Sequence, residues 1–179
     1  MKNLGLKGGP TQDEVMAVSL AKLGIRPGDR VADIGCGTGK VAIAMSRVAE
    51  CVYAIDRRPE AIAYARREAA AAGAGKIEFF EGEATDILSR IDHLDAAFVG
   101  GSRGLPEVLD LLAARVQGRI VVNAVMVGTL HEAIRSMQRL GIFIEAIHLQ
   151  VSRTTAIAGG MMFKPLNPVY IIVGGAGCS

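Results

Sequence analysis

The sequence predicts an α/β protein whose core is a seven-stranded, mostly parallel sheet with helices on both faces and a terminal antiparallel strand pair. Short apolar runs alternate with longer amphipathic stretches from residue 12 to residue 140, which is typical of repeated strand–helix–strand units. After Gly141 two apolar runs follow with no helical pattern between them, so we expect those strands to pair antiparallel. The length of 179 residues fits a single domain over residues 1–179.

The predicted strands are short apolar runs that end at a glycine or at a polar residue. The segment between the last two strands carries Gly159-Gly160-Met161-Met162, and we expect a loop there, with both methionines filling the core rather than covering a flat ligand. The strands are expected at residues 30–34, 51–55, 76–80, 94–99, 119–123, 142–152 and 169–173.

The predicted helices are the amphipathic stretches, and their ends carry start and stop signals. Thr11 and Glu14 have capping-box spacing before the first helix, which stops at Gly24, and Pro59 suits the first position of the third. The helices are expected at residues 12–23, 37–48, 60–72, 86–90, 105–116 and 130–140.

Composition and charge exclude several classes of protein. Half of the residues are hydrophobic and 21% are charged, which excludes a disordered chain. A net charge of +2 is too balanced to make nucleic acid the default partner. The three cysteines, Cys36, Cys51 and Cys178, have no metal-ligand or disulfide spacing, so no protein-bound metal is expected. The sequence lacks a signal peptide and an apolar run long enough to span a bilayer, so we expect a cytoplasmic protein without membrane association.

The segment from Asp33 to Gly39, Asp-Ile-Gly-Cys-Gly-Thr-Gly, is the most informative part of the chain. It joins a strand, a glycine turn and a helix start, where glycines let a ligand approach and the helix offers backbone N–H donors. Asp56 ends the next strand, 21 residues after Gly35, where a carboxylate accepts hydrogen bonds from both hydroxyls of a ribose. A dinucleotide-binding fingerprint would need a glycine where Lys40 stands, so the pattern favours a different nucleoside ligand.

These motifs resemble those of the class I S-adenosylmethionine-dependent methyltransferases, whose Rossmann-like sheet also ends in an antiparallel strand pair. The resemblance implies that Asp56 binds the adenosyl ribose and that Glu81-Gly82-Glu83-Ala84 flanks the adenine, although Glu83 stands where aspartate is commoner. It implies S-adenosylmethionine as methyl donor, bound by residues that lie mostly in the glycine turn. The implied cofactor-binding residues are Thr11, Gly35, Cys36, Gly37, Thr38, Gly39, Asp56 and Ala84.

Flanking segments narrow the resemblance to one group of tetrapyrrole methyltransferases. Residues 8–15, 28–35, 53–57, 99–102 and 160–162 are similar to the decarboxylating cobalt-precorrin carbon-15 methyltransferases of anaerobic cobalamin biosynthesis. The resemblance implies methyl transfer to carbon 15 of a cobalt-precorrin, with decarboxylation of an acetate side chain. It also implies a homo-oligomer, namely a homotetramer.

The residues that would bind such a substrate are expected at the carboxyl ends of the strands. A substrate with several carboxylates calls for arginines, and Arg57, Arg103 and Arg153 each follow a predicted strand. Asn123 ends the fifth strand and either orients substrate or closes a turn, just as Thr11 either lines the cofactor or caps a helix. Methyl transfer from an activated donor requires alignment more than a catalytic triad, so no catalytic residue is assigned.

Other functions on the same scaffold stay open. RNA or protein methylation is the main alternative, although 4% aromatic residues and the balanced charge argue against RNA. A silent cofactor-binding module is a second alternative, which turnover would exclude. Asn167-Pro168-Val169-Tyr170 is similar to a motif of amine methyltransferases, but it stands at the entry to the last strand rather than after the fourth.

Overall fold

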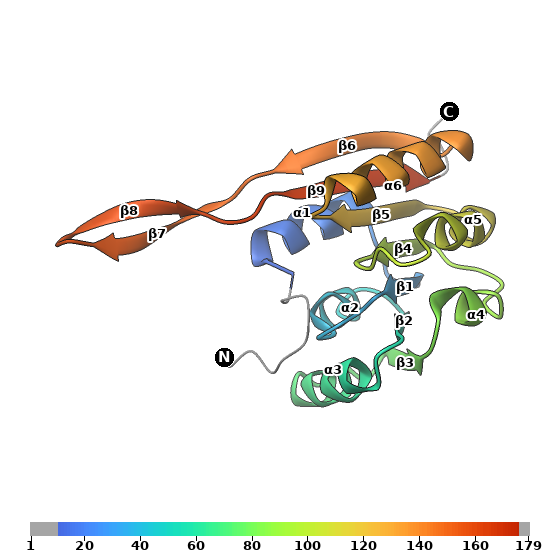
Figure 1. The fold of residues 1–179 in the computed structure, drawn as a ribbon. Helices are drawn as coiled ribbons and strands as arrows, with labels where there is room; N and C mark the ends of the chain where they lie inside the picture. Colours follow the sequence, from blue (N-terminus) through green and yellow to red (C-terminus); the bar gives the residue numbers. More distant parts are fainter. Residues whose placement is uncertain (1–10, 176–179) are drawn as a thin grey trace.

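The computed structural model describes residues 11–175 and contains a seven-stranded sheet with the strand order β3-β2-β1-β4-β5-β9-β6 (Figure 1). Strands β1 to β5 run parallel to one another, and β9 lies antiparallel to both β5 and β6. The predicted parallel sheet with a terminal antiparallel pair is confirmed. The strands are β1 (Arg30–Ile34), β2 (Cys51–Asp56), β3 (Ile77–Glu81), β4 (Ala96–Val99), β5 (Arg119–Ala124), β6 (Phe143–Leu149) and β9 (Val169–Gly175).

Helices cover both faces of the sheet because its central strands are apolar on both sides. Along β1, Val31 belongs to the apolar layer under α1, α2 and α3, and Ala32 to the layer under α4, α5 and α6. Helix α3 opens at Pro59, as predicted, and α1 ends at Gly24 in the left-handed conformation. The helices are α1 (Asp13–Leu23), α2 (Lys40–Met45), α3 (Pro59–Ala71), α4 (Ala84–Leu88), α5 (Leu105–Arg115) and α6 (Val127–Arg139).

The segment predicted as a loop between the last two strands forms a hairpin instead. Strands β7 (Ser152–Ile157) and β8 (Gly160–Pro165) pair antiparallel as a second sheet, which extends from the body as an arm (Figure 1). Ala158 and Gly159 both have positive φ, the geometry of a tight two-residue hairpin turn. Met161 and Met162 are 69% and 41% exposed, so the prediction that they fill the core is wrong.

Several predicted helix starts are also wrong. Helix α2 begins at Lys40, three residues after the predicted start, because Gly37 and Gly39 have positive φ and belong to the turn before it. The N-cap of α1 is Gln12, which makes no side-chain cap hydrogen bond, and Glu14 binds the arm instead of completing a capping box. Helix α6 begins at Val127, three residues before the predicted start, because Val127 and Gly128 have low helix propensity and hide the first turn. Within residues 11–175 no helix is both long and apolar enough to cross a bilayer.

Candidate functional site

A cleft of ≈ 400 Å³ lies where β1, β2 and β4 end and where the chain turns from β3 into α4. Parallel strands bring their carboxyl ends to one edge of the sheet, which is where ligands bind in open α/β folds. Gly35, Asp56 and Ala84, all predicted to bind the cofactor, line this cleft together. A larger hollow of ≈ 590 Å³ lies at the opposite edge, but it lacks the glycine turn and contains charged side chains of both signs.

Two glycines of the turn after β1, Gly35 and Gly39, are packed too tightly to be replaced by residues with side chains. A Cβ atom on Gly35 would lie 2.8 Å from the backbone nitrogen of Gly101 in the turn after β4, and one on Gly39 would lie 2.8 Å from Cβ of Ala65. Both glycines have positive φ, which other residues adopt only with strain. Of the residues of this turn, only Gly35 lines the cleft, and because it has no side chain a ligand can approach its backbone closely.

The N–H groups of this turn are already used within the protein. Gly35 and Cys36 both donate to the carbonyl oxygen of Ile55, at 2.8 and 3.0 Å, and Gly37 donates to Oδ2 of Asp56 at 2.9 Å. The predicted free N–H donors are therefore not free at these three positions. The buried thiol of Cys36 belongs to the core, and burial raises its pKa.

Asp56 is almost fully buried and accepts four hydrogen bonds from residues that the structure describes. Besides the Gly37 N–H, the donors are the backbone N–H, Nε and Nη2 of Arg58, at 3.0, 2.9 and 2.9 Å. Burial alone would raise the pKa of Asp56, but the hydrogen bonds from Arg58 and Gly37 outweigh it and the pKa is lowered. The neighbouring Arg57 is a predicted substrate residue, whereas no motif in the sequence indicates a role for Arg58.

A second carboxylate, Asp33, lies on the face of β1 that α2 covers. It is 1% exposed, and neither of its oxygens has a well-formed hydrogen bond among the described residues, although the backbone N–H of Ala42 partly offsets the effect of burial on its pKa. Burial, with a smaller contribution from the charge of Asp56, raises its pKa to about 7. Asp33 is not among the residues that line the cleft, so its carboxylate is a feature of the covered face of the sheet.

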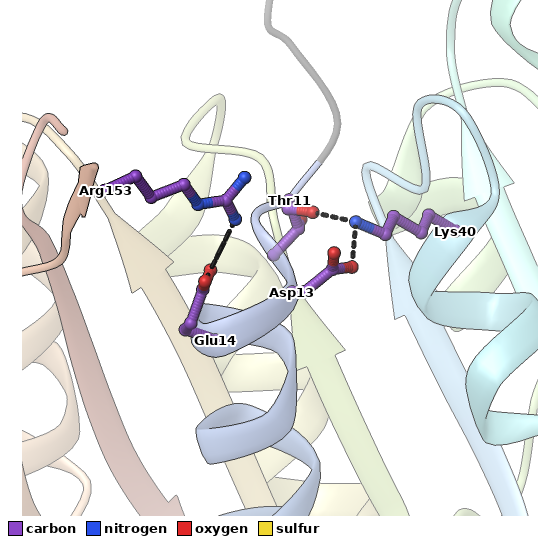
Figure 2. Close-up of polar contacts among 5 residues, drawn as sticks. All are labelled: Thr11, Asp13, Glu14, Lys40 and Arg153. Atoms are coloured by element: carbon purple, nitrogen blue, oxygen red, sulfur yellow. Dashed lines mark hydrogen bonds and ion pairs between the residues drawn. The ribbon is translucent and has the colours of Figure 1, made fainter. Parts of the chain in front are cut away.

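The first turn of α1 is tied to two other parts of the molecule, as Figure 2 shows. Nζ of Lys40 donates to the carbonyl oxygen of Thr11 at 2.6 Å and pairs with Oδ1 of Asp13 at 2.7 Å. On the other side, Nη2 of Arg153 contacts both carboxylate oxygens of Glu14, at 3.0 and 2.8 Å. Thr11 thus lies against the helix that follows the glycine turn, and it is not the helix cap.

The four substrate candidates separate into two pairs. Arg57 and Arg103 line the cleft, and Nε of Arg103 lies 3.8 Å from Oε1 of Glu83. Arg153 lies in β7 rather than after the sixth strand, and Asn123 donates from Nδ2 to Oγ of Ser19 in α1, at 3.0 Å. Neither of these two lines the cleft, because Arg153 is held by Glu14 and Asn123 joins β5 to α1.

The remaining predicted cofactor residues, Cys36, Gly37, Thr38 and Gly39, form the turn beside the cleft rather than its lining. The residues therefore fit an adenosyl ligand: a bare glycine turn, Asp56 at the end of β2 and Ala84 at the start of α4. In the described part of the chain, no group of three or more His, Cys, Asp or Glu side chains is arranged to hold a metal ion.

Comparison with known proteins shows the family of the chain. The family model of the precorrin methyltransferase domain matches residues 6–174. A Methanosarcina acetivorans protein named "Probable cobalt-precorrin-6B C(15)-methyltransferase (decarboxylating)" is 46% identical over 176 residues, 96% of each chain. The crystal structure of a precorrin 8W decarboxylase from Methanobacterium thermoautotrophicum has a TM-score of 0.92 and 34% identity, covering 98% of this chain and 96% of that one.

A precorrin-6y C5,15-methyltransferase from Geobacter metallireducens has a TM-score of 0.89 and 30% identity, covering 98% of this chain and 94% of that one. The family match spans nearly the whole sequence, and these similarities extend over the full sheet and the arm. The chain therefore belongs to the precorrin methyltransferase family, whose members are S-adenosylmethionine-dependent enzymes.

Proposed function

We propose that residues 1–179 form one methyltransferase domain that moves a methyl group from S-adenosylmethionine to carbon 15 of a cobalt-precorrin. The same reaction removes carbon dioxide from an acetate side chain, as a cytoplasmic step of cobalamin biosynthesis. The observation that carries the proposal is the cleft itself, in which Asp56 and Ala84 lie beside Arg57 and Arg103. A nucleoside end and a cationic end in one cleft suit a nucleoside donor and a polycarboxylate acceptor.

Each element at the cofactor end of the cleft would contact a different part of S-adenosylmethionine. Asp56 would bind the ribose hydroxyls, and the backbone at Ala84 would lie along the adenine. Gly35 to Gly39 would let the donor lie against the turn, with Thr11 closing the site from the α1 side. When bound, S-adenosylmethionine supplies a methyl group that is already activated on sulfur.

The substrate end must align the acceptor carbon with the methyl group and exclude water. Arg57 and Arg103 would bind carboxylates of the tetrapyrrole, and no side chain needs to act as a nucleophile. Loss of carbon dioxide would leave the electron pair of the broken bond in the conjugated ring. That pair would form the new bond from carbon 15 to the methyl carbon as the sulfur–methyl bond breaks. A trapped product that carries the new methyl and still holds its carboxylate would contradict this order.

A homotetramer is the second part of the proposal, and the arm supports it. An isolated two-stranded hairpin is marginal in water, so the arm gains stability if other copies cover it. Its strands expose Ile157, Met161 and Phe163 by 52%, 69% and 69%, a concentration of apolar surface that is typical of a contact between chains. Figure 1 shows the arm extending beyond the body, where another copy can reach it.

The experiment that tests the function supplies methyl-labelled S-adenosylmethionine to the protein with either cobalt-precorrin-6B or transfer RNA. The proposal predicts label in the tetrapyrrole and none in the RNA. Label in RNA, or in a protein substrate, would support the alternative function. Tight binding of the donor with no transfer to any acceptor would point to a binding module.

A further inference from the structure

We propose that Arg58 occupies the ribose-binding positions of Asp56 in the ligand-free protein, and that donor binding moves its guanidinium into the cleft to bind an acceptor carboxylate. The inference rests on the proposed function and adds a residue that couples the two substrates. Among the described side chains, only that of Arg58 hydrogen-bonds the carboxylate of Asp56.

The four acceptor positions of Asp56 are all filled. An ionised carboxylate offers about four lone-pair sites. Two are taken by backbone N–H groups, those of Gly37 and Arg58, which hold the carboxylate in place. The other two are taken by Nε and Nη2 of Arg58, one on each oxygen, both at 2.9 Å.

A ribose has two neighbouring hydroxyls, and it needs one acceptor site on each carboxylate oxygen. Those are the two sites that the Arg58 guanidinium fills. The guanidinium also lies over the glycine turn, since Nη2 is 3.7 Å from where a Cβ of Gly37 would be. Donor binding and the Arg58–Asp56 side-chain contact therefore compete for the same place.

Once displaced, the guanidinium has a destination. Arg58 already lines the cleft together with Arg57 and Arg103, and its side chain is 29% exposed. A guanidinium displaced from Asp56 can pair with another carboxylate, and a tetrapyrrole with acetate side chains supplies one. Donor binding thus strengthens acceptor binding, which by linkage is reciprocal. Acceptor is then held tightly only when the methyl donor is in place.

The sign of one measurement tests the competition. If Arg58 blocks the ribose sites, Arg58→Gln binds S-adenosylhomocysteine more tightly than wild type, by about threefold to tenfold in calorimetry. If Arg58 instead only orients Asp56, the same variant binds more weakly. A weaker or unchanged Kd in Arg58→Gln overturns the proposal.

Two further variants show whether an effect on the Kd comes from occupancy of the Asp56 acceptor sites, from the positive charge at position 58, or from damage to the fold. Arg58→Lys keeps the positive charge but cannot make the two-point contact, so it should also bind S-adenosylhomocysteine more tightly than wild type. A wild-type Kd in Arg58→Lys would mean that charge alone matters, and would overturn the competition. Arg139→Gln is the matched control, because it removes an arginine–aspartate pair, with Asp110, that lies away from the cleft. Its Kd should stay within twofold of the wild-type value.

The coupling is measured with uroporphyrin, an octacarboxylate tetrapyrrole, as the acceptor probe. In wild type, saturating S-adenosylhomocysteine should lower the Kd of uroporphyrin several-fold, and in Arg58→Gln it should not. Equal coupling in both proteins overturns the proposed destination of Arg58. A wild-type protein that binds no S-adenosylhomocysteine would sink the proposed function itself, so the two failures are distinguishable.

Discussion

Asp33 in β1 and Asp56 at the end of β2 are buried carboxylates near the glycine turn, and their pKa values are shifted in opposite directions. Asp56 accepts four hydrogen bonds and its pKa is lowered, so it is charged at neutral pH. Asp33 has no well-formed hydrogen bond within residues 11–175, and burial, only partly opposed by the backbone N–H of Ala42, raises its pKa to about 7. Burial is common to both, so hydrogen bonding decides the direction. The site thus keeps one fixed anion and one carboxylate that can gain a proton near neutral pH.

Asp33 should make the folded state less stable as the pH rises. Its native pKa of about 7 lies above the ordinary value of 3.8, so between these values the folded state binds more protons than the unfolded state. The free energy of unfolding then falls as pH rises through that window. Asp33→Asn should remove this slope and raise the free energy of unfolding above the window by up to about 4 kcal/mol. Urea unfolding of both proteins across the window measures it, and parallel pH profiles would contradict the assignment.

Gly39 should tolerate no side chain. Gly39→Ala places a Cβ at φ +76° and 2.8 Å from Cβ of Ala65, so we expect a loss of about 1–3 kcal/mol from backbone strain, and more from the clash. Gly128→Ala is the control, because a Cβ there meets nothing within 4 Å inside α6, and it should be neutral or stabilising by about 0.5–1 kcal/mol. Equal effects of the two substitutions on chemical unfolding would refute this account of the turn.

At the residue scale, a residue's place in the cleft could be predicted where the residue lies directly at the end of a predicted strand. Asp56 could be predicted at the cleft because it ends β2, and Ala84 because it follows β3. Arg57 and Arg58 are adjacent, and no sequence pattern says which of them turns back on the carboxylate. The backbone after β2 decides that, because it brings both the N–H and the guanidinium of Arg58 to Asp56.

At the scale of elements, the first turn of α1 connects two parts of the molecule. Neighbouring residues on a helix point in different directions, so Asp13 and Glu14 reach different partners. Asp13 pairs with Lys40 at the start of α2, and Glu14 pairs with Arg153 at the base of the arm (Figure 2). Both carboxylates also lie in the first turn, where the helix dipole favours negative charge.

Lys40 should hold the start of α1 in place rather than stabilise the whole fold. Lys40→Met removes the contacts to Thr11 and Asp13, so backbone amides in the first turn of α1 should exchange hydrogen several-fold faster. The free energy of unfolding should fall by less than about 1 kcal/mol, because the pair is partly exposed. Lys22→Met is the control, since it removes a similar ion pair with Glu145 from the far end of α1. Unchanged exchange in Lys40→Met would contradict the role.

The arm is the element that sequence reasoning missed. The sequences of its two strands give a weak strand signal. Both faces of the hairpin are exposed, so no alternation of apolar and polar residues marks a buried side. The central strands were predictable for the opposite reason, since burial on both faces makes them continuous apolar runs. The arm's turn at Ala158 and Gly159 was hidden because alanine seldom adopts positive φ.

At the scale of the whole molecule, the arm's apolar surface should set the oligomeric state. Phe163 is 69% exposed, and Phe163→Lys places a charge where we propose that copies meet. Sedimentation should show a tetramer for wild type and smaller species for the variant. Val48→Lys is the matched control, because Val48 is 42% exposed near the end of α2 and should leave the tetramer intact. A monomeric wild-type protein, or a Phe163→Lys tetramer, would contradict the proposed assembly.

The central claim is that one cleft carries out both methyl transfer and decarboxylation on a tetrapyrrole. The most direct test is the mass spectrum of cobalt-precorrin-6B after incubation with S-adenosylmethionine and this protein. The account predicts a product that has gained one methyl group and lost one carbon dioxide. An acceptor of unchanged mass, with the donor bound and wild-type folding intact, would contradict the claim and leave only the fold and the family.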